Sequence, residues 1–135
     1  MMMGGYASEK LTFKDISTGA SNDLKEASEL ARRLVTKYGM SELGPITFGK
    51  TEELIFLGRE IAMEKNYSEK VAAKIDEQVQ KILKSAYVIA EKILAQNKAA
   101  LKKLADTLME KETLEQEEFY ALIKPFRIKL VAIAV

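Results

Sequence analysis

Ser17-Thr18-Gly19-Ala20-Ser21-Asn22-Asp23-Leu24 opens the first strongly amphipathic helix predicted in this chain of 135 residues. From Ala20 to Tyr38, apolar side chains recur at intervals of three and four residues, which is the period of a helix with one buried stripe. The stripe consists of Leu24, Ala27, Ala31, Leu34 and Tyr38. Gly39 follows it and predicts a left-handed cap. The helical core therefore begins at this stretch.

Asp23 is the residue of this stretch to which we assign chemistry. It lies one position before Leu24, at the flank of the stripe, so its carboxylate can face a neighbouring element without entering the deepest core. The positive end of the helix dipole also explains an acidic residue in a first turn. Thr18, Ser21 and Asn22 have the side chains of helix caps, and capping alone explains them. Spacing by itself favours the structural interpretation.

The remaining sequence predicts further helices. Residues 1–10 read as a helix interrupted by Gly4-Gly5, and residues 11–16 read as a short connector. Residues 52–65 form a short helical or irregular passage. Ser68 is a good cap for the longest helix, which runs to Asn97 and has helical period for more than seven turns. Its apolar positions are Val71, Ala72, Ile75, Val79, Ile82, Leu83, Ala86, Ile89, Ala90, Ile93 and Leu94.

Two shorter helices follow the long one. Asn97 can cap a helix over Lys98–Glu110, whose predicted inward positions are Leu101, Leu104, Ala105 and Leu108. Thr113 and Gln116 have the spacing of a capping box for a last helix through Ile123. Pro125 ends the regular pattern. The predicted fold is mainly α, a single helical domain of about five helices over residues 1–124, with a tail of unknown structure over residues 125–135.

A helical hairpin organises this predicted domain. The long helix and Lys98–Glu110 pack against each other as its spine, and a short non-helical insert lies around Met40 to Lys50. Residues 126–135 are strand-like in composition, and we assign them no function.

Composition excludes several functions. The chain is 47% hydrophobic and 30% charged with a net charge of +1, which gives no general attraction to nucleic acid. No apolar run approaches the roughly 20 residues that span a bilayer, and no signal peptide is visible, so we expect a soluble chain. Cysteine and histidine are both absent. Catalytic zinc sites usually need nitrogen or sulfur ligands, so these residues cannot form one alone.

A phosphate-loop pattern occurs over Gly44 to Thr51, which read GPITFGKT and match GxxxxGK[ST]. A phosphate loop follows a buried strand, whereas a helix and its glycine cap precede this one. Pro45 has no amide hydrogen, and Ile46 and Phe48 are bulky where the loop must wrap a phosphate closely. Glu52-Glu53 would place two negative charges beside it. We expect no nucleotide-binding residues here.

Several sequence words occur together in the order seen in one family. They are Met3-Gly4-Gly5, STGASNDL over 17–24, Ala31-Arg32-Arg33, YGMSELGP over 38–45, Phe56-Leu57-Gly58-Arg59 and Asn66-Tyr67-Ser68. Over about residues 3–123 the chain resembles the carboxy-terminal part of the peptidase domain of the FtsH family, membrane-anchored ATP-dependent zinc metalloproteases. The family usually has GGRxAEE where this chain has Gly4-Gly5-Tyr6-Ala7-Ser8-Glu9-Lys10. The family's LGP loop accounts for the phosphate-loop pattern.

The resemblance implies proteolysis of unfolded or membrane-extracted proteins by a hexameric ring on the cytoplasmic side of a membrane. It implies Zn²⁺ in the peptidase site, and ATP with Mg²⁺ at a separate ATPase module. The family's HExxH helix supplies two histidines and the glutamate base, and Asp23 corresponds to the third zinc ligand. Gly19 and Ala20 would let the turn approach the metal-binding helix closely.

The resemblance also implies what this chain alone lacks. HExxH lies upstream of the Gly4-Gly5 word in the family, so we expect these residues to contain no catalytic residue, no cofactor-binding residue other than the metal ligand Asp23, and no peptidase activity of their own. The alternative is a helical interaction or oligomerisation module that kept the scaffold and lost the chemistry. An in-frame HExxH and ATPase module upstream of Met1 would distinguish the two.

Overall fold

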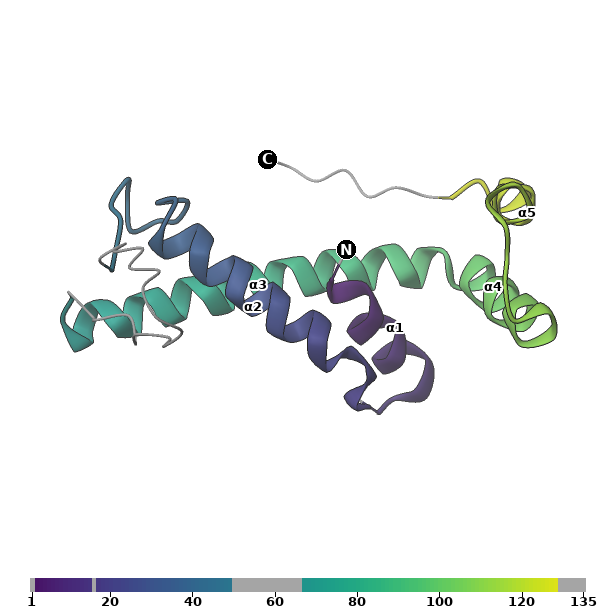
Figure 1. Ribbon diagram of the computed structural model, residues 1–135, viewed down its shortest axis with the longest axis horizontal. Helices are drawn as coiled ribbons and strands as arrows, with labels where there is room; N and C mark the ends of the chain where they lie inside the picture. The colour runs from purple at the N-terminus through teal and green to yellow at the C-terminus, as the bar shows by residue number, and fades with distance from the viewer. Residues whose placement is uncertain (1, 16, 50–66, 129–135) are drawn as a thin grey trace, which may run out of the picture. The chain divides into compact units, whose positions relative to one another are not determined.

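The computed structural model describes residues 2–15, 17–49 and 67–128. Within these ranges the chain forms five α-helices, two short 3₁₀ helices and no strand, which confirms the mainly α prediction (Figure 1). The elements are α1 (Met3–Phe13), η1 (Thr18–Ala20), α2 (Ser21–Thr36), α3 (Glu69–Gln96), α4 (Lys98–Lys111), α5 (Gln116–Ile123) and η2 (Lys124–Phe126). The predictions for residues 52–65 and for most of the tail lie outside the described residues.

The helices form two compact units. One contains Met1–Ser21 and Ala86–Val135, and the other contains Asn22–Ser85. α3 is divided between the two units. Its residues up to Ser85 belong to the unit Asn22–Ser85, and its residues from Ala86 onward belong to the other unit. No helix in the described ranges is both long and apolar enough to cross a bilayer.

α1 corrects two sequence predictions. Gly4 and Gly5 do not interrupt it, and the predicted connector after residue 10 is still helical as far as Phe13. Glycine destabilises a helix locally, but Met3 and Ala7 on the same helix are buried. Their packing stabilises α1 and outweighs the low helix propensity of the two glycines. The helix ends where Lys14 adopts the left-handed conformation, at φ 58°.

α2 and the first part of α3 enclose the core of the unit Asn22–Ser85. This core consists of Ala31, Val35, Ile75 and Val79, with Val35 and Ile75 both 0% exposed. Arg32 and Asp76 form an ion pair of 2.6 Å between the same two helices. The stripe predicted for α2 was therefore wrong at its end. Val35 is the buried residue there, while Leu34 is half-buried and Tyr38 is exposed.

The loop after α2 begins and folds as predicted. Gly39 has φ +62°, which confirms its left-handed cap. The backbone N–H of Phe48 donates to the Thr36 carbonyl at 2.7 Å, and the Phe48 ring meets the Tyr67 ring edge-on. Residues 40–49 are irregular, as predicted, and Ser68 caps α3 by accepting from the Val71 N–H at 3.4 Å.

The other unit shows where cap predictions fail. Asn97 precedes α4, but its side chain makes no cap hydrogen bond to that helix and donates to the Ile93 carbonyl at the end of α3 instead. Thr113 forms no capping box, because α5 begins at Gln116 with Glu115 as its N-cap and no side-chain cap bond. Along α4, Ala100 is buried whereas Leu108 is 43% exposed.

The junction between α3 and α4 bears on the predicted hairpin. Asn97 alone separates the two helices, whereas loops that reverse a helix ordinarily contain two residues or more. Packing of these two helices as a spine stays a prediction.

α1 packs against the end of α3 through aromatic rings. Tyr6 and Tyr87 meet edge-on with 5.7 Å between ring centroids, and the Lys10 ammonium lies 5.3 Å from the Tyr87 centroid. The Tyr87 hydroxyl donates to Glu91 at 2.7 Å, and this bond raises the Tyr87 pKa. Tyr6 and Lys10 thus make an aromatic and cation–π contact at the positions where the resembled family has Arg and Glu.

Candidate functional site

Asp23 lies in the first turn of α2, as the sequence predicted. Its side chain is half-buried. Within the described part of the chain its carboxylate takes part in no hydrogen bond or ion pair. The helix dipole presents a partial positive charge at this end of α2. The Asp23 carboxylate is therefore available to a partner from outside the described residues.

The neighbouring polar residues are occupied with each other. The Asn22 side-chain amide donates to Glu26 one turn further along α2, at 3.0 Å. The Ser21 backbone N–H donates to the Thr18 carbonyl, which joins η1 to α2. The Ser17 side chain caps η1, because its Oγ accepts from the Gly19 N–H at 3.0 Å. Asp23 is thus the acid of this turn that is left without an internal partner in the described chain.

Glu9 on α1 holds the turn that leads to Asp23. Its Oε2 accepts from the Ser17 backbone N–H and its Oε1 accepts from the Ser17 hydroxyl, both at 3.0 Å. Sequence reasoning quoted Glu9 within a family word but gave it no role. The two residues are eight positions apart on separate elements, so no local spacing rule connects them.

Gly19 is small because the turn lies close to α1. A Cβ at this position would lie 3.1 Å from both Glu9 Oε1 and Ser17 Oγ, which is tighter than ordinary packing. Ala20 is buried at 3% exposure. In the described residues Gly19 approaches the Glu9 carboxylate, and the approach of these small residues to a metal-binding helix stays a prediction.

The residues present fit one carboxylate ligand and not a complete metal site. Among the described residues, no three acids, histidines or cysteines gather closely enough to hold an ion. The whole chain has no histidine and no cysteine. Catalytic zinc sites usually include nitrogen or sulfur ligands, so these would have to come from outside these 135 residues if Asp23 is a ligand.

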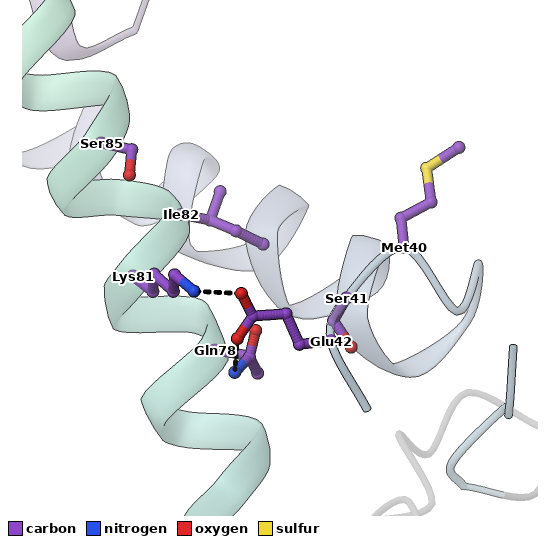
Figure 2. Close-up of a pocket in the computed structure, with 7 residues that line it drawn as sticks. All are labelled: Met40, Ser41, Glu42, Gln78, Lys81, Ile82 and Ser85. Atoms are coloured by element: carbon purple, nitrogen blue, oxygen red, sulfur yellow. Dashed lines mark hydrogen bonds and ion pairs between the residues drawn. The ribbon is translucent and has the colours of Figure 1, made fainter. Parts of the chain in front are cut away.

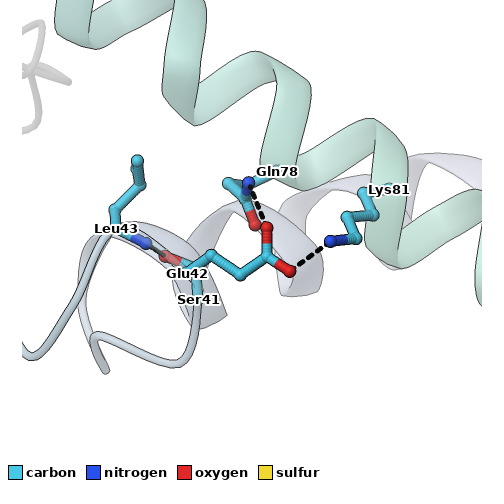
Figure 3. A network of polar contacts seen from close by, with 5 residues as sticks. All are labelled: Ser41, Glu42, Leu43, Gln78 and Lys81. Carbon is cyan, nitrogen blue, oxygen red and sulfur yellow. Dashed lines mark hydrogen bonds and ion pairs between the residues drawn. The ribbon is translucent and has the colours of Figure 1, made fainter.

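A separate polar cluster follows the other end of α2. The Glu42 carboxylate is held by Lys81 and by Gln78, whose amide donates to it at 3.4 Å (Figure 3). The hydrogen bond from Lys81 lowers the Glu42 pKa, and the hydrogen bond from Gln78 lowers it by a smaller amount. Ser41 Oγ accepts from the Leu43 N–H at 3.3 Å, which braces the same loop.

This cluster borders a shallow depression of about 430 Å³. Its walls are Met40, Ser41, Glu42, Gln78, Lys81, Ile82 and Ser85 (Figure 2). Glu42 and Lys81 neutralise each other there, and Asp23 lies at the opposite end of α2. The depression is therefore separate from the candidate ligand. The phosphate-loop pattern begins at Gly44, just after the loop residues of this depression. α2 precedes that loop, whereas a nucleotide-binding phosphate loop follows a strand. The expected absence of nucleotide binding stays a prediction.

Comparison with known proteins gives a family match over most of the chain. The model of Peptidase family M41 matches residues 1–122. The ATP-dependent zinc metalloprotease FtsH of Caldicellulosiruptor bescii is 52% identical over 123 residues, which cover 90% of this chain and 20% of that protein. FtsH 1 of Thermomicrobium roseum is 50% identical over 123 residues, covering 90% and 19%. FtsH of Thermotoga maritima is 44% identical over 123 residues, covering 90% and 20%. The chain spans about a fifth of the length of these relatives.

Proposed function

Because this chain belongs to peptidase family M41, we propose that it provides part of the peptidase domain of an ATP-dependent zinc metalloendopeptidase. In this role Asp23 supplies the third zinc ligand, and the helices provide the body that holds it. The observation that carries the proposal is the state of Asp23, a half-buried carboxylate at the start of α2 with no polar partner in the described chain.

The chemistry of a carboxylate suits this role. The Asp23 carboxylate would hold zinc together with two histidines from outside this sequence, and zinc held there would activate a water molecule. Zinc bound in this way lowers the pKa of its water ligand toward neutrality. Asp23 would supply a carboxylate oxygen to the metal. Its position in the first turn of α2 would set the direction from which that oxygen approaches the metal. The two histidines and the glutamate base belong to an HExxH segment outside this sequence.

The complete enzyme has further features that we include in the proposal. Its relatives are named as ATP-dependent zinc metalloproteases. From the family resemblance we also propose a place for the chain in a hexameric ring that degrades unfolded or membrane-extracted proteins on the cytoplasmic side of a membrane. ATP and Mg²⁺ act at a module outside this sequence, and the membrane anchor belongs to the complete enzyme.

A fusion tests the role of Asp23. The full 135-residue chain is joined to an HExxH-bearing segment of a related FtsH, and zinc content, zinc affinity and cleavage of an unfolded protein are measured. We expect about one zinc ion per chain and measurable cleavage. Asp23→Asn should lower zinc affinity by at least about 100-fold and abolish cleavage, because the neutral amide is a poor zinc ligand.

Two variants control for the loss of one charge. Asp106→Asn makes the same substitution at an exposed aspartate on α4, and Glu29→Gln removes an exposed charge from α2 itself. Both should keep zinc and cleavage at the level of the unmodified fusion. If the Asp23→Asn fusion keeps full zinc affinity and full activity, Asp23 is a helix-terminal acid and the proposal is wrong.

A further inference from the structure

We propose that the depression between α3 and the loop after α2 binds an apolar segment of an unfolded polypeptide, as a secondary substrate site at the far end of α2 from Asp23. The inference rests on the proposed function for its link to proteolysis. Its structural basis is an exposed methionine that stands beside a half-buried isoleucine and an ion pair, all within the unit Asn22–Ser85.

The loop holds the backbone of Met40 and leaves its side chain free. Gly39 turns the chain in the left-handed conformation, and the Met40 N–H then donates to the Leu34 carbonyl at 2.9 Å. Further along the loop, Leu43 and Phe48 pack against the core of the unit. The Met40 side chain is instead 65% exposed. Because its backbone is already fixed, Met40 can meet a partner with little further loss of conformational freedom.

α3 supplies the opposite wall of the depression. Ile82 packs partly against the core and points toward the space between α3 and the loop, and Ser85 stands three residues further along the helix (Figure 2). Met40 and Ile82 give the depression of about 430 Å³ its apolar walls. Pockets that bind small ligands have volumes of roughly 300–1,000 Å³. The depression therefore has room for side chains of a short segment that lies across the surface.

The charges of the depression favour a neutral occupant. Lys81 and Glu42 form an ion pair on its wall, so their charges cancel. The Gln78 amide also donates to the Glu42 carboxylate, at 3.4 Å. None of the other described residues that line the depression is charged. A phosphate group or a metal ion meets no unbalanced charge on these walls, whereas an uncharged apolar segment suits them.

Met40 suits substrates that share no fixed sequence. Its side chain is unbranched and polarizable, so it adapts to partners of different shape. Surfaces that bind many different partners often use such methionines. The proposed substrates are unfolded chains, in which apolar side chains are exposed. The depression thus matches this class of polypeptide rather than one sequence.

The distance from Asp23 fits a single extended substrate. α2 has 16 residues, and Asp23 lies in its first turn. At about 1.5 Å per residue, the helix from Asp23 to its end spans about 20 Å. An extended chain covers that distance in about six residues, at about 3.3 Å each. One polypeptide is therefore long enough to occupy the depression and to reach the metal ligand.

Peptide binding to the full 135-residue chain tests the site without metal. The probe is a short fluorescein-labelled peptide of glycine, serine and leucine, and the matched peptide has serine in place of each leucine. By fluorescence anisotropy we expect the leucine peptide to bind at least about 10-fold more tightly, the factor that burial of one large aliphatic side chain contributes. Met40→Ala should weaken its binding by at least about 5-fold. Met40→Leu should retain it.

Three further variants separate the depression from general effects. Ser85→Glu adds a negative charge that the ion pair does not balance, and it should weaken binding of the leucine peptide by about 10-fold or more. Gln80→Glu adds the same charge at an exposed position of α3 outside the depression and should leave binding unchanged. Met109→Ala is the control for Met40→Ala, because Met109 is 87% exposed on α4. Circular dichroism should show the same helix content in every variant.

Cleavage in the HExxH fusion tests the link to proteolysis, with casein as the unfolded substrate. Met40→Ala and Ser85→Glu should raise KM and leave kcat unchanged, because they remove binding that the ground state and the transition state share. If they alter neither peptide binding nor KM while Asp23→Asn abolishes cleavage, the substrate site is overturned and Asp23 stands as ligand. If peptide binding depends on Met40 but Asp23→Asn keeps full zinc affinity and activity, the metal proposal fails and the polypeptide site stands. If no peptide binds and Met40→Ala changes the sedimentation of the chain, the depression is a contact between copies and the inference is wrong.

Discussion

Glycine has opposite roles at two positions of this chain. Gly39 has φ +62°, and a Cβ there would lie 3.3 Å from Ile46 N and Pro45 Cα. The left-handed conformation costs an L-residue roughly 1–2 kcal/mol, so Gly39→Ala should lower the free energy of unfolding by at least about that amount. Urea unfolding followed by circular dichroism measures the change. A loss near zero would mean that the loop readily adopts another conformation.

Gly4→Ala is the matched substitution with the opposite expected sign. Gly4 lies in α1 and has open space around its missing Cβ. Alanine there should raise stability by about 0.5–1 kcal/mol, because it reduces the conformational freedom of the unfolded chain. Destabilisation at this position would contradict the continuous helix that the structure shows through Gly4 and Gly5.

At the scale of elements, burial along α3 predicts which substitutions matter. Ile75 is 0% exposed in the core with Val35, whereas Ile82 is only half-buried beside it. Ile75→Ala should cost about 2–5 kcal/mol of unfolding free energy, as buried isoleucine truncations do. Ile82→Ala should cost clearly less, although both residues lie on the same predicted apolar stripe of the long helix. Equal losses in urea unfolding would show that α3 is rotated from the orientation described.

The helical periods could be predicted from the sequence, but their phase and their caps could not. Intervals of three and four place α2 and α3 correctly, yet the choice between Leu34 and Val35 depends on contacts with Ile75 on another helix. Gly4-Gly5 predicts an interruption of the helix because helix propensity describes only local energy. The burial of Ala7 in tertiary packing outweighs this local preference. Asn97 had two possible partners, and its amide bonds the helix before it rather than the helix after it.

For the whole molecule, the candidate site was predictable only where a sequence word carried it. Asp23 was found because it lies within STGASNDL, and its dipole position alone favoured a structural role. The role of Glu9 could not be predicted, because its partner Ser17 lies on the next element. The left-handed conformation of Lys14 ends α1 between the two residues, and no local spacing rule foresees their contact. The division of the helices into two units is not predictable from local patterns, since one unit combines Met1–Ser21 with Ala86–Val135, which lie far apart in the sequence.

We expect the stability of each unit to depend on acid pH through one ion-paired glutamate. The hydrogen bond and charge of Lys81 lower the Glu42 pKa in one unit, and those of Lys111, at 2.7 Å, lower the Glu118 pKa in the other. A lowered folded-state pKa means that the unfolded chain binds protons first as pH falls. The stabilisation is therefore present above the unfolded-state pKa and is lost as pH falls through the folded-state value.

Glu42→Gln and Glu118→Gln should each remove part of this acid-side loss of stability. Urea midpoints measured from neutral pH to about pH 2 should decline less steeply in each variant than in the original chain, below the ordinary glutamate pKa of about 4.3. Because the two glutamates lie in separate units with no shared partner, their effects should add in the double variant. Both pairs are exposed, so salt at about 1 M should reduce the differences. A slope that neither substitution changes would mean that these ion pairs, although formed, do not bind their glutamates more favourably in the folded chain than water does in the unfolded one.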